Sequence, residues 1–219
     1  MSHVRRTATL VSVLLTALAL VLGTSVPANA LTLTGNGKAN TLKGKGGDDT
    51  LKGKGGDDTL LAASGDDKLY GGPGADLMRS GPGNDFNDGG PGNDFVQATD
   101  GKDVLIGRGG DDKVQGGSGN DSVDGGPGND RLDGGPGNDT LTDGPGNDRL
   151  SADEGDDVLH VGPGKDKAFG EEGTNILYVL NDGDKDEIYC GTGPNDTVVY
   201  VGGPDKADHV AFCEHERIQ

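Results

Sequence analysis

The chain has 219 residues and a formal net charge of −18 at pH 7, with 43 glycines, 10 prolines, no tryptophan and 31% hydrophobic residues. So few apolar residues cannot fill the interior of an ordinary globular domain, and by composition alone the chain resembles a disordered one. The acidity argues against nucleic acid and anionic membrane surfaces as partners and favours cations.

Residues 1–30 are typical of a secretory signal peptide. Arg5 and Arg6 give a charged start, residues 8–23 are almost entirely apolar, and residues 28–30 (Ala-Asn-Ala) form a small-residue cleavage site. A transmembrane anchor is the alternative, but the apolar run is short and ends at that cleavage site. We expect export by the general or the twin-arginine route and a secreted, extracellular protein that neither spans a membrane nor carries a lipid.

After cleavage, residues 31–43 are predicted to form an N-terminal capping strand and a degenerate repeat, because Leu31-Thr32-Leu33-Thr34 alternates as a strand does. Residues 44–178 then repeat one nine-residue unit without insertion or deletion. Each of fourteen consecutive units has an aspartate with glycine two residues before it and, except at Asn87, an apolar residue two residues after it. These aspartates are Asp49, Asp58, Asp67, Asp76, Asp85, Asp94, Asp103, Asp112, Asp121, Asp130, Asp139, Asp148, Asp157 and Asp166.

A regular unit is residues 125–133, Gly-Gly-Pro-Gly-Asn-Asp-Arg-Leu-Asp. Six turn-forming residues precede three that can be extended, with one apolar side chain facing inward. A strand of three residues needs a stacked neighbour, so the unit predicts an all-β parallel solenoid, a β-roll of about 15–16 nonapeptide repeats. Since each turn reverses the chain, two units make one coil of 18 residues.

Alternate aspartates then line opposite edges of the roll. Stacked strands lie about 4.8 Å apart, and at that spacing neighbouring carboxylates repel by roughly 1 kcal/mol in water and several-fold more at an interface. A cation that prefers oxygen ligands relieves this repulsion. Calcium accepts carboxylate and carbonyl oxygens in flexible geometry, whereas magnesium is stricter and zinc and copper prefer histidine and cysteine.

The unit resembles the repeats-in-toxin (RTX) family of calcium-binding β-rolls, whose pattern is G-G-x-G-x-D-x-U-x, over residues 44–177. The resemblance implies that each aspartate binds calcium with turn carbonyls of its own and the adjacent turn, at up to six sites per edge and about twelve in all. Regular repeats are expected to bind best, above all residues 116–150. Repeats that begin with Ala62-Ala63, Ala98-Thr99 or Ala152-Asp153 should bind less well.

After Leu177 the nine-residue period slips, and residues 179–219 are predicted to form a C-terminal cap over the open end. Cys190 and Cys213 are the two cysteines, both in the exported part, so a disulfide is expected; metal ligation is the alternative. This segment also resembles the C-terminal ends of exported actinobacterial proteins with such repeats.

The leading function is a secreted, non-catalytic calcium-binding protein that folds on external calcium. The alternative is an adhesin, cell-surface or matrix module, with a cell-wall, polysaccharide or protein partner left open. An outward apolar stretch from Leu77 to Val104 would be either its contact surface or merely another coil surface. An enzyme is disfavoured, because the repeats leave no room for a catalytic domain and no histidine has a serine or cysteine partner arrangement.

Overall fold

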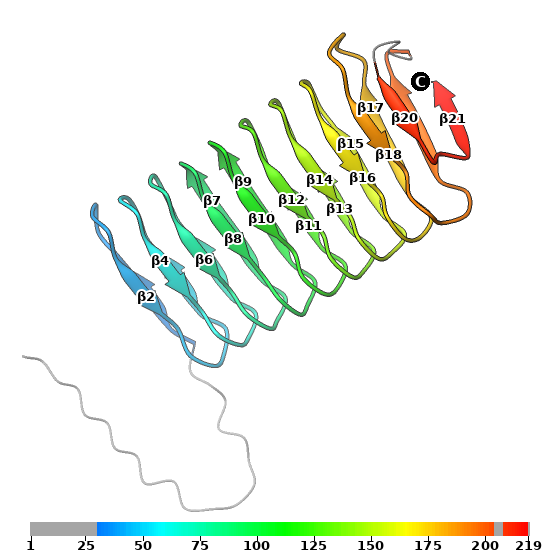
Figure 1. Ribbon diagram of the computed structural model, residues 1–219. Helices are drawn as coiled ribbons and strands as arrows, with labels where there is room; N and C mark the ends of the chain where they lie inside the picture. The colour runs from blue at the N-terminus through cyan, green and yellow to red at the C-terminus, as the bar shows by residue number, and fades with distance from the viewer. Residues whose placement is uncertain (1–29, 204–207, 219) are drawn as a thin grey trace, which may run out of the picture.

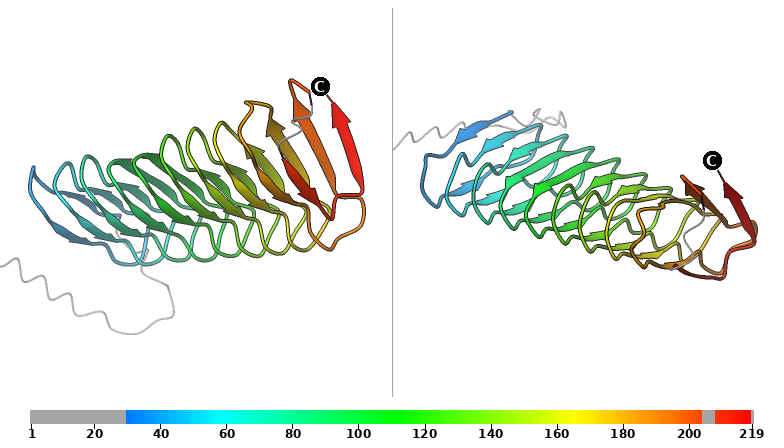
Figure 2. Two further views of the ribbon diagram at one scale, coloured as in Figure 1. Left: turned by 45° about the horizontal axis from the view of Figure 1, so that its top comes forward. Right: turned by 90° about the horizontal axis from the view of Figure 1, so that it is seen from above.

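The computed structural model describes residues 30–203 and 208–218. They form a parallel β-solenoid of 21 short strands in two sheets, with no helix among them (Figure 1). Figure 2 shows the two sheets running side by side along the whole stack. The described part therefore has no helix that is long and apolar enough to cross a membrane. The predicted signal peptide lies, up to residue 29, outside the described residues.

The eleven-stranded sheet contains, in spatial order, β1 (Thr32–Thr34), β3 (Thr50–Lys52), β5 (Lys68–Tyr70), β7 (Phe86–Pro91), β9 (Val104–Gly109), β11 (Ser122–Asp124), β13 (Thr140–Thr142), β15 (Val158–Val161), β17 (Ile176–Leu180), β19 (Thr197–Val201) and β21 (His215–Ile218). The ten-stranded sheet contains β2 (Thr41–Lys43), β4 (Thr59–Leu61), β6 (Leu77–Arg79), β8 (Phe95–Gln97), β10 (Lys113–Gln115), β12 (Arg131–Asp133), β14 (Arg149–Ser151), β16 (Lys167–Phe169), β18 (Glu187–Tyr189) and β20 (His209–Ala211).

The sheet register confirms a coil of two repeats. Strands two apart in sequence pair in parallel, so that Val123 lies beside Leu141 and Leu132 beside Leu150, each 18 residues on. In β11 and β12, as in most of the short strands, the middle residue is buried and its two neighbours are more exposed. The all-β parallel solenoid predicted from the period is therefore confirmed.

The interior consists of two stacked columns of apolar side chains, one from each sheet, fully or almost fully buried. Asn87 interrupts one column, between Leu69 and Leu105, with no exposed surface. Its Nδ2 donates a hydrogen bond of 3.1 Å to Ser80 Oγ. Ser80 stands at the first position of its repeat, where regular repeats have glycine. Its hydroxyl therefore partly satisfies the hydrogen-bonding needs of the buried Asn87 amide.

Glycine at the second and fourth positions of a repeat is required by backbone conformation. In the repeat that begins at Gly71, Gly72 has φ +98° and Gly74 has φ +146°, values that residues with a side chain rarely adopt. Irregular repeats put other residues at the second position, and Lys54, Ala63 and Asp153 there have φ of 87°, 112° and 74°. These repeats hold backbone strain that the regular ones avoid.

The C-terminal segment continues the roll in its described part, and its role as a cap stays a prediction. Its strands β18 to β21 pair in parallel with β16 to β19 and add further coils to both sheets. The coils lengthen from 18 residues to 20 between Lys167 and Glu187 and to 22 between Ile188 and Val210. The period therefore slips because the turns lengthen. No separate cover over the end is formed by residues 179–203 and 208–218.

The outward apolar stretch differs from the prediction. Leu77 pairs with Phe95 in the ten-stranded sheet, whereas Phe86 pairs with Val104 in the eleven-stranded sheet. Residues nine apart lie on opposite sheets, so the four side chains form two small pairs in place of one surface. The predicted continuous contact surface is wrong.

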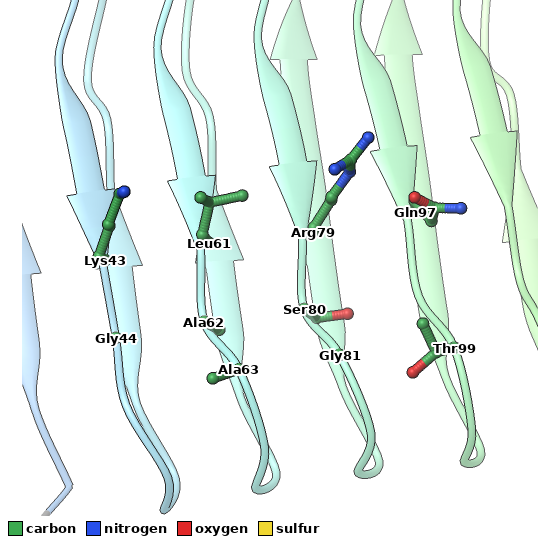
Figure 3. Close-up of a pocket in the computed structure, with 10 residues that line it drawn as sticks. All are labelled: Lys43, Gly44, Leu61, Ala62, Ala63, Arg79, Ser80, Gly81, Gln97 and Thr99. Carbon is green, nitrogen blue, oxygen red and sulfur yellow. The ribbon is translucent and has the colours of Figure 1, made fainter.

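A shallow hollow of about 340 Å³ lies across β2, β4, β6 and β8 of the ten-stranded sheet (Figure 3). Lys43, Leu61, Arg79 and Gln97 line it from successive strands, with the first-position residues beneath them. Its lining has two cationic side chains but neither carboxylate nor imidazole. This hollow therefore offers no acid–base pair for catalysis.

Candidate metal centres

The fourteen repeat aspartates form two buried columns, one along each edge of the roll. One column holds Asp49, Asp67, Asp85, Asp103, Asp121, Asp139 and Asp157, and the other holds Asp58, Asp76, Asp94, Asp112, Asp130, Asp148 and Asp166. None exposes more than 3% of its surface. The structure thus brings together the aspartates that the sequence singled out, in the two predicted sets.

One carboxylate oxygen of each aspartate is accounted for by the fold. The backbone N–H of Asp112 donates to Oδ1 of Asp130 at 2.7 Å, and the N–H of Asp121 donates to Oδ1 of Asp139 at 2.8 Å. The same bond joins successive aspartates along both columns. Each aspartate therefore ties its coil to the one before it, which is a structural role independent of any metal.

The other oxygen, Oδ2, has no hydrogen-bond partner in thirteen of these buried side chains. The exception is Asp49, whose Oδ2 accepts the N–H of Lys45 at 2.8 Å. A buried carboxylate oxygen without a donor costs several kcal/mol unless a cation compensates it. The columns are thus acceptor-rich in a way that protein atoms do not satisfy.

Where the first position of a repeat is glycine, the free Oδ2 faces a second acceptor, a main-chain carbonyl of the next coil. At Gly116, the point where a Cβ atom would stand lies 2.6 Å from Oδ2 of Asp121 and 2.6 Å from the carbonyl oxygen of Gly134. At Gly125, the corresponding distances to Oδ2 of Asp130 and the carbonyl oxygen of Asp143 are 2.6 and 2.8 Å. First-position glycine therefore leaves open a space that two acceptor oxygens border. These oxygens repel each other unless a cation lies between them.

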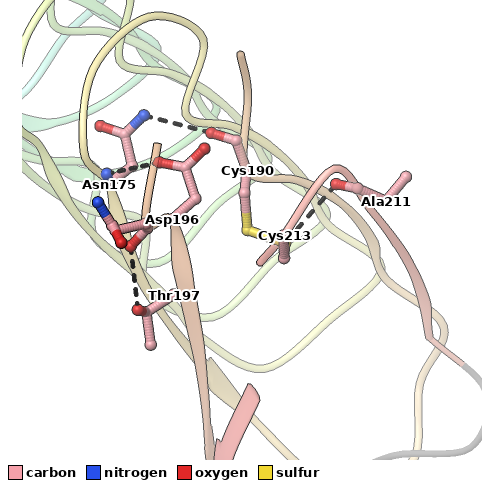
Figure 4. Close-up of a disulfide and its surroundings, with 7 residues drawn as sticks. Asn175, Cys190, Asp196, Thr197, Ala211 and Cys213 are labelled. Atoms are coloured by element: carbon pink, nitrogen blue, oxygen red, sulfur yellow. Dashed lines mark hydrogen bonds between the residues drawn. A yellow bond between two sulfur atoms is a disulfide. The ribbon is translucent and has the colours of Figure 1, made fainter. Parts of the chain in front are cut away.

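Asn175, which continues the first column, shows what this space requires. Where the aspartates present Oδ2, Asn175 presents Nδ2, and it donates a hydrogen bond of 3.2 Å to the carbonyl oxygen of Cys190 (Figure 4). The backbone arrangement is otherwise kept, because Oδ1 of Asn175 accepts the N–H of Asp157 at 3.0 Å. An amide thus satisfies the carbonyl through its own proton, whereas an aspartate needs a positive charge from outside the chain.

Burial also shifts the acid–base behaviour of the columns. Loss of hydration raises the pKa of Asp112 and Asp139 to about 7 and that of Asp130 to about 6. Repulsion by neighbouring carboxylates raises these pKa values further, and the backbone hydrogen bond to Oδ1 opposes the rise. Without a cation the columns therefore hold protons up to about neutral pH, and a bound cation would favour their ionised form.

The donor set fits a hard cation. Buried carboxylate and main-chain carbonyl oxygens suit calcium, which accepts six to eight oxygens in variable geometry. Among the repeats the only imidazole is that of His160, whose ring stacks on Tyr178 in the outer face of the roll. The columns thus lack the nitrogen and sulfur ligands that zinc and copper prefer.

A family model of the RTX calcium-binding nonapeptide repeat matches residues 34–69, 52–86, 88–123, 109–141, 124–159, 142–177 and 151–185. The chain belongs to this family. The roll is therefore a calcium-binding RTX β-roll. Comparison with curated proteins finds no match to the chain. The predicted actinobacterial likeness of the C-terminal segment stays a prediction.

Sequence reasoning missed three buried aspartates. Asp186 and Asp196 continue the two columns, since Oδ1 of Asp186 accepts the N–H of Asp166 at 2.9 Å and Oδ1 of Asp196 accepts that of Asn175 at 2.8 Å. Their spacings of 20 and 21 residues hid them from a search at nine. Asp143 was overlooked because it occupies a first position, where the repeat pattern expects glycine.

The predicted disulfide between Cys190 and Cys213 is confirmed, with their Cα atoms 5.0 Å apart (Figure 4). It joins two successive C-terminal coils, and the N–H of Cys190 also donates to the carbonyl of Ala211 at 3.1 Å. Metal ligation by these cysteines is thereby excluded. Disulfides persist in oxidising compartments, which agrees with an extracellular location.

Proposed function

We propose that this RTX protein is secreted, has no catalytic role and folds when it binds external calcium between its coils. Asp49 through Asp166, at every ninth position, would supply the carboxylate ligands, and the turn carbonyls would supply the rest. Six gaps between seven aspartates on each edge give up to about twelve ions. The observation that carries the proposal is the pairing of a free buried Oδ2 with a facing carbonyl oxygen. At Asn175 the side-chain N–H donates to that carbonyl instead.

The proposed organisation follows from this role. Residues 1–30 would direct export and be removed, residues 31–43 would start the stack, and residues 44–178 would hold the ions. Residues 179–219 would end the roll with longer, disulfide-linked coils, because the cross-link restrains strands that have fewer regular repeats beside them. Calcium is the proposed partner. The adhesin alternative loses support, since its contact surface is divided between two sheets.

Far-ultraviolet circular dichroism of the mature protein tests coupled folding. In a chelator the neighbouring carboxylates within each column repel one another, so the spectrum should be that of a disordered chain. Millimolar calcium should convert it to a β-rich spectrum. Magnesium at the same concentration is the control for simple screening of charge, and it should be much less effective. A full β spectrum in the chelator would sink the proposal.

A further inference from the structure

Asp143 places a third carboxylate beside one pair of column aspartates. It stands at the first position of the repeat Asp143-Gly144-Pro145-Gly146-Asn147-Asp148, where the preceding repeat has Gly134. One carboxylate oxygen from each of Asp143, Asp148 and Asp166 lies within 4.8 Å of the other two. All three side chains are at least 97% buried.

The side chain of Asp143 is held in place by one oxygen only. Its Oδ1 accepts the N–H of Gly144 at 2.7 Å and that of Gly162, on the next coil, at 2.8 Å. Its Oδ2 is buried without a hydrogen-bond partner, as are Oδ2 of Asp148 and Oδ2 of Asp166. The hydrogen bonds thus fix the carboxylate and leave three free acceptors around one region.

Charge compensation from the chain is missing at this point. The ion pairs in the described residues join Arg108 to Asp88 and Lys167 to Glu187, on the outer faces. The cluster therefore has three carboxylates where the other inter-coil sites have two. Calcium sites are tuned by the number of charged ligands and by their rigidity, and this site exceeds its neighbours in both.

We propose that Asp143, Asp148 and Asp166 form the tightest calcium site of the chain, with Asp143 as an additional ligand. This inference rests on the proposed calcium binding and adds a residue outside the repeat pattern. Asp143 also contributes its main-chain carbonyl to the neighbouring site of Asp130. An ion at the cluster would therefore lie next to an ordinary site on the same edge.

The test is a calcium titration of the full mature chain in competition with a chromophoric chelator, for wild type, Asp143→Gly and Asp143→Asn. Asp143→Gly restores the glycine of the regular repeats, and Asp143→Asn keeps the Oδ1 acceptor while removing the charge. Both should lose the tightest class of site, with its affinity reduced by about tenfold or more, and keep the weaker classes. Asp124→Asn, which removes one charge from an exposed strand position, is the control and should leave the tight class intact.

Retention of the tight class in either Asp143 variant would overturn the inference, since the third carboxylate would then be unnecessary. A circular dichroism spectrum in saturating calcium establishes that each variant is folded before its titration is interpreted. Wild type that binds no calcium would instead refute the proposed function itself. Wild type with one uniform class of sites, unaffected by Asp143, would refute only the inference.

Discussion

Replacing Asp112 by asparagine should remove calcium and yet stabilise the metal-free fold. Oδ1 of Asp112 accepts the N–H of Asp94 at 2.8 Å, and its Oδ2 lies without a donor near the carbonyl of Gly125. Asparagine keeps the first bond and offers Nδ2 to the carbonyl, as Asn175 does with Cys190. Burial raises the pKa of Asp112 from 3.8 to about 7, so ionisation at pH 8 costs the metal-free fold about 4 kcal/mol at most.

Asp112→Ala is the matched control, because it removes the same charge but bonds neither the N–H of Asp94 nor the carbonyl of Gly125. We expect the asparagine variant to exceed wild type in metal-free stability by up to about 4 kcal/mol, and to exceed the alanine variant by about 1–3 kcal/mol. Urea unfolding at pH 8 in a chelator, with a stabilising osmolyte added equally to all samples, brings the three proteins into a measurable range. Calcium counting on the same samples should show fewer bound ions in both variants. An asparagine variant that is less stable than wild type without calcium, or binds the full number of ions, would refute the reasoning.

Four further changes have defined outcomes. Asp121→Ala, in a regular repeat, should raise the calcium midpoint of folding more than Asp157→Ala, and equal effects in isothermal titration would contradict a ranking by glycine content. Gly116→Ala should weaken one calcium site, since its Cβ would lie 2.6 Å from two of the oxygens that border it, and an unchanged calcium titration would show that this space is unimportant. Folding raises the pKa values of the column aspartates, so the folded metal-free chain binds more protons than the unfolded one. Its stability should therefore fall from about pH 4 to about pH 7 and level off above. A circular dichroism titration in chelator in which the folded fraction rises over this range would contradict the burial argument. Cys213→Ser should lower the unfolding free energy by roughly 3 kcal/mol with the repeat ions retained, and unchanged thermal stability would show that packing alone holds the last coils.

The period of the sequence was sufficient to predict the fold and the two columns. Spacing of nine fixes which side chains face inward, and spacing of 18 fixes which aspartates stack, so the pairing of Val123 with Leu141 follows from arithmetic. The period could not predict how the two oxygens of one carboxylate divide their roles. That division depends on the three-dimensional path of the turn, which presents an N–H to Oδ1 and a carbonyl to Oδ2.

The errors arose where the period no longer describes the turns. Beyond Leu177 the turns lengthen, so Asp186 and Asp196 occupy column positions at spacings that a period of nine does not predict. The outward apolar stretch is divided because the chain reverses at each turn, so that residues nine apart lie on opposite sheets. Asn87 and Ser80 compensate each other across seven residues, a contact that no nine-residue pattern contains.

A crystal structure grown in calcium, with long-wavelength anomalous data, tests the central claim most directly. The account predicts anomalous peaks between successive coils along both edges, each within about 2.3–2.6 Å of an aspartate Oδ2 and of turn carbonyl oxygens. It also predicts no peak beside Asn175 where Nδ2 donates to the carbonyl of Cys190. Edges that hold only water between Oδ2 and the facing carbonyls, in a roll that is otherwise folded, would contradict the claim.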